Sequence, residues 1–430
     1  MKIFWAIFLF SGVLMASVLP QHYKKRLDNG LLVVAIPLDN GTGVIATNVF
    51  YRVGSRNEVM GKSGIAHMLE HLNFKSSKNL KAGEFDQIIK RFGGTTNAST
   101  GLDYTHYYIK SSKQSLDKSL ELYAELMQNL TLKDDEFQPE RNVVAEERRW
   151  RTENDPFGYL YFRLFNTAFT YHPYHWTPIG FMADIQNWTI EDIESFHKLY
   201  YQPQNAIVLV SGDIKPDEVF AAAKKHFGGI ANTTPLPRFY QQEPEQDGER
   251  RAIVRKESEV EMVAIAYKTP PFNHDDQLAL DMLATLLGSG KSSQLNVKTV
   301  EKERLASSVY VRNMDTIDNG LFFMMGIANP NVSAKKVEES ILTQIHKLQK
   351  GEISDKEIAK VKKALKTQFI NAIENSSMIA SVFGNYYIKG DIGPLVGFQE
   401  KLERISKKDL LRVANQYFTK DTRTIVILKR

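Results

Sequence analysis

The sequence contains no cysteine in its 430 residues. This absence excludes a disulfide framework and a thiolate metal site, so any metal must be held by His, Asp or Glu. A strong excess of one charge is also missing, because 55 basic residues against 50 acidic ones leave a net charge of +5. That balance does not indicate a nucleic acid partner. The chain does have 43% hydrophobic residues and enough length for two or three domains with buried cores.

Long apolar runs are absent except at the start of the chain. Lys2 precedes an apolar stretch from Ile3 to Met15, and the small residues Ala16 and Ser17 follow it. This is the layout of a secretory signal peptide, and the stretch is short for a membrane span of roughly 20 residues. The pattern predicts a leader over residues 1–19 and a mature protein secreted across the inner membrane into the periplasm. A leader that stays attached, as the anchor of a peptide-binding module, is the alternative.

The remaining chain shows the same order of strands and helices twice. In the first half we expect strands near 31–36, 44–53, 103–110 and 206–210, and helices near 64–74 and 116–130. In the second half we expect strands near 251–254, 262–267 and 424–428, and a helix near 277–287. A polar stretch without periodicity separates the halves. The pattern predicts an α+β duplication, with domains over 20–232 and 251–430 joined by a linker at 233–250.

The segment HMLEH at 67–71 is the clearest chemical signal. Residues four apart share one face of a helix, so His67 and His71 can bind one metal ion, with Glu70 beside them. The apolar residues of this helix form a separate, core-facing stripe: Ile65, Met68, Leu69 and Leu72. The alternative is a solvated helix face with a chance histidine pair. The second half has no such pattern, so only the first half is expected to bind metal.

Two histidines leave a catalytic zinc short of one protein ligand, which in peptidases is usually a carboxylate. The segment PERNVVAEERRW predicts a helix that opens near Pro139. Its spacing places Glu140 and Glu147 on one inward stripe together with Val143 and Val144, and turns Glu146 away. We therefore expect Glu147 to be a ligand and Glu140 to support the site. The alternative is that these glutamates pair with neighbouring arginines: Arg141, Arg148 or Arg149.

Four segments resemble the M16 metallopeptidases, the family of pitrilysin, insulysin and mitochondrial processing peptidase, in a short bacterial M16B-like form. They are HMLEHLNFKSS at 67–77, GGTTNASTGLDYTHY at 93–107, ERNVVAEERRW at 140–150 and YYQPQNAIVLVSGDI at 200–214. The 76 positions from His71 to Glu147 match the family's spacing to its third ligand. The resemblance implies two duplicated α/β sandwich domains of the LuxS/MPP-like type. It also implies zinc at His67, His71 and Glu147, Glu70 as general base and Glu140 as a helper.

The resemblance further implies a zinc-dependent endopeptidase that cuts peptides or unfolded segments inside a closed chamber. Family members pair an extended peptide with an edge strand, which here corresponds to Asn97, Ala98, Ser99 and Thr100. An ordinary turn and strand rich in Thr and Asn is the alternative for this segment. A non-catalytic scaffold or interaction subunit is the alternative for the whole chain.

The second half departs from the family at its substrate-holding pair. Active members usually carry an Arg and, seven positions later, a Tyr within a GLAYS-like stretch. Here the stretch is ERLASS, which puts Val300 and Ser307 at those places. This departure implies a heterodimer with a non-catalytic M16 paralogue that supplies the pair. Substitution by Arg304 or Tyr310 keeps a homodimer possible.

Three other patterns do not predict a site. His172 and His175 are separated by Pro173, which disrupts a helix, so we expect a loop rather than a second metal pair. GSGKSS at 288–293 lacks the first glycine of a phosphate loop. His106 falls in an alternating strand, where a packed or hydrogen-bonded histidine is the common outcome.

Overall fold

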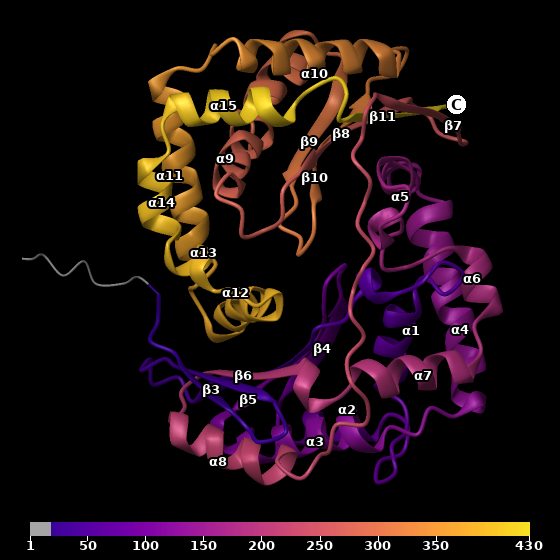
Figure 1. Cartoon of the computed structure of the whole chain (residues 1–430), viewed down its shortest axis with the longest axis vertical. Coiled ribbons are helices and arrows are strands. Elements are labelled where there is room, and N and C mark those ends of the chain that lie inside the picture. The colour runs from indigo at the N-terminus through magenta and orange to yellow at the C-terminus, as the bar shows by residue number, and fades with distance from the viewer. Residues whose placement is uncertain (1–18) are drawn as a thin grey trace, which may run out of the picture.

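The computed structural model describes residues 19–430, so the predicted leader lies outside them except for its last residue, Leu19 (Figure 1). It contains two mixed sheets. The first has the order β1-β2-β6-β3-β5-β4, with β1 Tyr23–Arg26, β2 Leu32–Pro37, β3 Val44–Tyr51, β4 Thr95–Thr100, β5 Thr105–Ser112 and β6 Ala206–Gly212. The second has the order β7-β11-β8-β10-β9, with β7 Arg250–Arg255, β8 Met262–Thr269, β9 Ala306–Asn313, β10 Gly320–Ala328 and β11 Arg423–Lys429.

The two sheets share one topology. β2 runs parallel to β6 in the first sheet, β7 runs parallel to β11 in the second, and the other pairs are antiparallel. When β1 is left out, the two sheets have the same strand order, and β4 and β9 are the corresponding edge strands. The predicted α+β duplication is therefore confirmed.

Helices cover both faces of each sheet. The first half contains α1 Ile65–Leu72, α2 Glu84–Arg91, α3 Leu116–Asn129, α4 Asp134–Arg148, α5 Pro156–Ala168, α6 Met182–Asn187, α7 Ile190–Tyr200 and α8 Pro216–Phe227. The second half contains α9 Gln277–Gly288, α10 Ala334–Gln349, α11 Asp355–Asn371, α12 Ser376–Lys389, α13 Gly393–Val396, α14 Phe398–Arg404 and α15 Lys407–Tyr417. Within residues 19–430, no helix combines the length and the apolar character needed to cross a membrane.

Each half lends one helix to the sheet of the other (Figure 1). Ile379 and Phe383 of the second-half helix α12 pack on one face of the first sheet, against Val34, Phe50 and other buried strand residues. The approach is so close that a Cβ at Gly384 would lie 2.1 Å from the Phe50 ring. The first-half helix α5 packs reciprocally on β8 and β11 of the second sheet. The two halves therefore share their cores, and the predicted domain limits stay a prediction.

The start of α4 differs from the expectation. The helix begins at Asp134 rather than near Pro139, which lies inside it. The acidic residues of the first turn, Asp134, Asp135 and Glu136, complement the positive end of the helix dipole and explain the earlier start. The inward stripe is also only partly right, because Val144 is buried whereas Val143 is 50% exposed.

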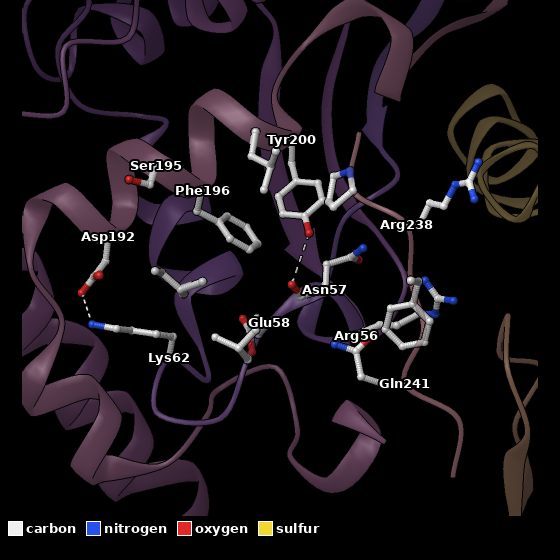
Figure 2. Close-up of a pocket in the computed structure, with 15 residues that line it drawn as sticks. Arg56, Asn57, Glu58, Lys62, Asp192, Ser195, Phe196, Tyr200, Arg238 and Gln241 are labelled. Atoms are coloured by element: carbon white, nitrogen blue, oxygen red, sulfur yellow. Dashed lines mark hydrogen bonds and ion pairs between the residues drawn. The ribbon is translucent and has the colours of Figure 1, made fainter. Parts of the chain in front are cut away.

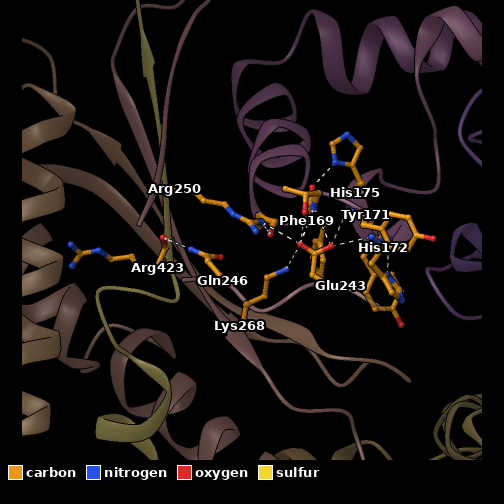
Figure 3. Close-up of polar contacts among 12 residues, drawn as sticks. Phe169, Tyr171, His172, His175, Glu243, Gln246, Arg250, Lys268 and Arg423 are labelled. Atoms are coloured by element: carbon orange, nitrogen blue, oxygen red, sulfur yellow. Dashed lines mark hydrogen bonds and ion pairs between the residues drawn. The ribbon is translucent and has the colours of Figure 1, made fainter. Parts of the chain in front are cut away.

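The segment between the halves has no helix or strand from residue 228 to 249, yet it is firmly attached. The carboxylate of Glu243 accepts the backbone N–H groups of Thr170, Tyr171 and His172 at 2.9–3.1 Å (Figure 3). It also pairs with Arg250 of β7 at 3.3 Å and lies 3.6 Å from the ammonium of Lys268 on β8. The linker is thus a strap that joins a first-half loop to the second sheet.

Candidate metal centre

The helix that carries HMLEH starts at a tightly packed turn. Gly64 caps it with a φ of +87°, and a Cβ there would lie 2.7 Å from the Ile179 carbonyl oxygen. The buried carboxylate of Glu58 accepts the backbone N–H groups of Gly64 and Ala66 at 2.8 and 2.9 Å, and the indole N–H of Trp176 at 2.7 Å. A carboxylate at this end also favours the helix dipole. These contacts fix the first turn of α1, which includes His67.

The side chains of α1 divide as the sequence predicted. Ile65, Met68, Leu69 and Leu72 are at most 3% exposed and pack in the first-half core. His67, Glu70 and His71 lie on the other side of the helix, facing α4 and the edge strand β4.

Three side-chain atoms converge beside this helix. The Nε2 atoms of His67 and His71 lie 3.8 and 3.4 Å from Oε2 of Glu147 on α4. A tetrahedral ion with bonds of about 2.0–2.1 Å places its ligand atoms about 3.4 Å apart. In residues 19–430, this is the one group of three or more His, Cys, Asp or Glu side chains close enough to share a metal ion.

The three donors differ in protonation. Burial, together with the nearby His71, lowers the pKa of His67 to about 4, so this ring is neutral at pH 7. Burial disfavours a charge on His71 too, but hydrogen bonds to Glu140 and Glu147 raise its pKa to about 9. Burial likewise opposes ionisation of Glu147, yet its contacts with the two histidines hold its pKa below the ordinary value. The anionic carboxylate is therefore ready to bind a cation.

Further contacts orient the donors. Oε1 of Glu140 lies 2.8 Å from Nδ1 of His71, and its other oxygen accepts from Lys75 at 2.5 Å. This is the carboxylate–histidine pairing that fixes the ring of a zinc ligand. Arg151 binds the second oxygen of Glu147 at 2.6 Å. Sequence reasoning missed Lys75 and Arg151. Helical spacing indicates the contact of Arg151 with Glu147, four residues before it, whereas Lys75 reaches Glu140 on α4 and only the fold brings the two together.

Glu146 and Glu147 have the different roles that helical geometry suggested. The Glu146 side chain is 71% exposed and pairs with Arg149, whereas that of Glu147 is 17% exposed. Of the three arginines named in the alternative, Arg149 pairs with Glu146, whereas Glu147 contacts both histidines and Arg151. Burial also leaves Nδ1 of His67 without a hydrogen-bond partner in the described residues. A neutral imidazole carries one proton, and placing it on this Nδ1 leaves Nε2 with a lone pair directed at the site.

The edge strand β4 runs past the same point. Its last residue, Thr100, donates a hydrogen bond from Oγ1 to Oε2 of Glu70. The residues along the strand alternate in exposure, and its outer edge is unpaired within residues 19–430. A pocket of about 380 Å³ adjoins the strand and is lined by Glu70, His71 and Asn97, among others. The predicted base, the three candidate donors and an open strand edge thus meet in one place.

The histidines judged not to be ligands are engaged elsewhere. His172 lies with Nε2 at 3.0 Å from Asp318, and its Nδ1 accepts from the Tyr174 amide. His175 contacts the Phe169 carbonyl at 2.6 Å. His106 stacks on Phe50 and binds Asn48, as expected for a packed histidine.

Comparison with known proteins shows the family of the chain. The family model "Insulinase (Peptidase family M16)" matches residues 33–173, and the model "Peptidase M16 inactive domain" matches residues 187–365. The zinc protease PqqE of Helicobacter pylori is 56% identical over 416 residues, which cover 96% of this chain and 94% of that protein. The chain belongs to the M16 family of peptidases.

Solved structures of M16 proteins share the fold. A protease from Helicobacter pylori is similar with a TM-score of 0.94 at 55% identity, covering 96% of this chain and all of that one. A peptidase M16 inactive domain from Pseudomonas fluorescens is similar with a TM-score of 0.86 at 16% identity, covering 95% and 97% of the two chains. The second of these likenesses shows the fold alone.

The two possible substitutes for the M16 substrate-holding pair, Arg304 and Tyr310, make no polar contact with the candidate metal centre within residues 19–430. Tyr310 is exposed on β9, with its ring 5.2 Å from that of Phe157. Arg304 has a φ of +53° at the turn before β9. Within residues 19–430, neither side chain makes a hydrogen bond or ion pair with the metal-site residues. The structure therefore assigns no substitute for the pair.

A second pocket of this M16 chain was not foreseen from the sequence. It has a volume of about 380 Å³ and lies between α7 and the strap, with Phe196, Tyr200 and Phe239 among its lining residues (Figure 2). Its floor includes Ile65 and Glu58, at the start of α1, but none of the three donor residues. It is separate from the metal centre.

Proposed function

We propose that this chain is a zinc-dependent endopeptidase that hydrolyses peptides or unfolded protein segments. The observation that carries the proposal is the convergence of His67, His71 and Glu147, with Glu70 beside them at an open strand edge. Two imidazoles and one carboxylate are the donor set of catalytic zinc sites in peptidases, which keep one position open. The name of the zinc protease from Helicobacter pylori agrees with this choice of metal.

The proposed roles follow from the chemistry of each side chain. When bound, zinc would acidify the attacking water and polarise the scissile carbonyl. Glu70 accepts the proton of that water and returns it to the leaving amine, a role that suits a buried carboxylate whose pKa is raised by burial. Glu140 holds the ring of His71 in the orientation that directs Nε2 to the metal.

We propose that substrate binds as an added strand along β4. An extended peptide would pair with the free backbone edge at Asn97, Ala98, Ser99 and Thr100. Main-chain hydrogen bonds depend little on side chains, so this mode supports broad recognition of unfolded segments.

The first test is hydrolysis of a quenched fluorescent peptide library by the mature chain. We expect activity that a chelator removes and zinc restores. Glu70→Gln should abolish turnover while retaining one zinc per chain, because Glu70 is not a ligand. Glu146→Gln, on the exposed side of α4, is the matched control and should behave as wild type. Zinc-loaded protein without activity under any condition would refute the peptidase proposal.

A non-catalytic scaffold remains the second candidate, favoured by one observation. Val300 and Ser307 stand where active relatives carry the substrate-holding Arg and Tyr, so the chain by itself lacks that pair.

If the chain is an active peptidase, we propose that a non-catalytic M16 paralogue supplies this pair in a heterodimer. A homodimer is the alternative. Activity that appears only on mixing with the paralogue would support the heterodimer, whereas activity of the chain alone would favour the homodimer.

We also propose secretion to the periplasm, on the leader pattern of residues 1–19. Sequencing the N-terminus of the mature protein tests it. An intact Met1 in the native protein would favour a retained anchor.

A further inference from the structure

One hydrogen bond joins the edge strand to the proposed base. Thr100 Oγ1 donates to Oε2 of Glu70, and Oε1 of Glu70 has no hydrogen-bond partner among the described residues. A hydroxyl that holds one carboxylate oxygen leaves the other free to face a reacting group. It also fixes the rotation of the carboxylate, which a glutamate on a helix surface otherwise samples freely.

Thr100 itself sits on a rigid support. The carbonyls of the next two residues accept the backbone N–H groups of Ser55 and Arg56 at 3.2 and 2.8 Å. The buried carboxylate of Asp103 then accepts the Tyr174 hydroxyl at 2.5 Å and the Ile317 backbone N–H at 2.9 Å. Ile317 belongs to the second half, so the turn after β4 is fastened from both halves. The position of the Thr100 hydroxyl is therefore set by the fold rather than by a flexible loop.

The second half contains the corresponding bond without a metal site. Asn313, the last residue of the edge strand β9, donates from Nδ2 to the buried carboxylate of Asp281 on α9 at 2.8 Å. Strand order makes β9 the counterpart of β4 and β8 that of β3, and α9 follows β8 along the chain as α1 follows β3. This tie between strand and helix thus also occurs where, among the described residues, no set of three metal-donor side chains converges. A purely structural role for Thr100 is the competing explanation that a test must separate.

We propose that Thr100 is a positioning residue that holds Glu70 in the orientation required to activate water. This inference rests on the proposed peptidase function. It gives Thr100 a role different from the strand-addition contact suggested above, because its hydroxyl is directed at the base instead of the substrate edge.

The test compares three variants in the zinc-loaded mature chain with the quenched peptide assay. Thr100→Val keeps the shape but removes the donor, and should lower kcat about 10- to 100-fold with KM within about twofold. Thr100→Ser keeps the donor and should stay within about threefold of wild type. Thr343→Val, at an exposed position of α10, is the control and should leave both constants unchanged.

Each other outcome overturns the proposal. A rise in KM with unchanged kcat would make Thr100 a substrate contact. Equal losses in the Val and Ser variants would assign the effect to packing of the methyl group. Reduced thermal stability with wild-type kcat would leave only the structural role seen at Asn313. Failure of the peptidase function itself is distinct, because the wild-type chain would then also be inactive.

Discussion

Metal binding should be strongly coupled to protons through one histidine. In the metal-free chain the pKa of His71 is raised to about 9, whereas that of His67 is lowered to about 4. At pH 7 a cation must therefore displace one proton, from His71. Two pKa units correspond to about 2.7 kcal/mol, so zinc affinity should rise about tenfold per pH unit between pH 7 and 9 and level off above.

The stability of the metal-free fold depends on pH in the opposite direction to zinc affinity. Because the pKa of His71 is raised above its ordinary value of about 6.5, the bound proton stabilises the metal-free fold. That contribution is complete below about pH 6.5 and is lost as the pH rises through about 9. The metal-free protein should thus lose stability over the interval in which it gains affinity for zinc.

Isothermal titration calorimetry of the chelator-stripped chain, in two buffers with different ionisation enthalpies, measures the protons released. We expect about one proton per zinc at pH 7 and none above about pH 9.5. Glu140→Gln removes a carboxylate bonded to His71 and should move the levelling point to lower pH, while Glu146→Gln should leave it in place. Affinity that is flat between pH 7 and 9, or release of two protons, would refute this assignment.

Two further predictions concern the fold. Phe383→Ala removes a buried ring of α12 that packs on the first sheet, so it should lower the free energy of unfolding by about 3–5 kcal/mol in a denaturant titration that still shows one transition. The control Ile370→Ala, at an exposed site of α11, should lower it by under about 0.5 kcal/mol. Equal losses in the two variants would argue against the shared core. Gly54→Ala should lower the thermal midpoint and peptidase activity, because its Cβ would lie 2.5 Å from the Gly101 carbonyl oxygen, whereas Gly248→Ala meets no atom within 4 Å and should be neutral.

Local signals in the sequence predicted much of the metal centre. His67 and His71 repeat at helical spacing opposite an apolar stripe, and the structure places both on one side of α1. Helical geometry also separated Glu147 from Glu146. These features depend on neighbours within one or two turns, which periodicity captures directly. The predicted start of α4 was wrong because Pro139 was taken as a first-turn residue, although three acidic residues before it already indicate an earlier start.

Contacts between distant segments were not predictable in this way. The exchange of α5 and α12 between the halves depends on complementary apolar faces from segments far apart in the sequence, and each helix alone resembles any buried helix. The strap was likewise expected to be only a polar linker, whereas Glu243 collects three backbone donors and two cations. A carboxylate in a polar run gives no sign of such partners until the fold brings them together.

The internal symmetry shows that a few side chains distinguish the candidate metal centre of the first half from the corresponding place in the second half. If Asp281 takes the place of Glu70, as its bond to the end of the edge strand indicates, the two histidine positions fall to Leu278 and Met282. Both are apolar, and Met282 is buried in the second core. The tie from helix to edge strand is therefore kept where the metal donors are absent, which indicates that the scaffold needs it for packing. In the first half, the same tie holds a carboxylate that stands next to three converging donors, so under our proposal a structural contact also serves catalysis.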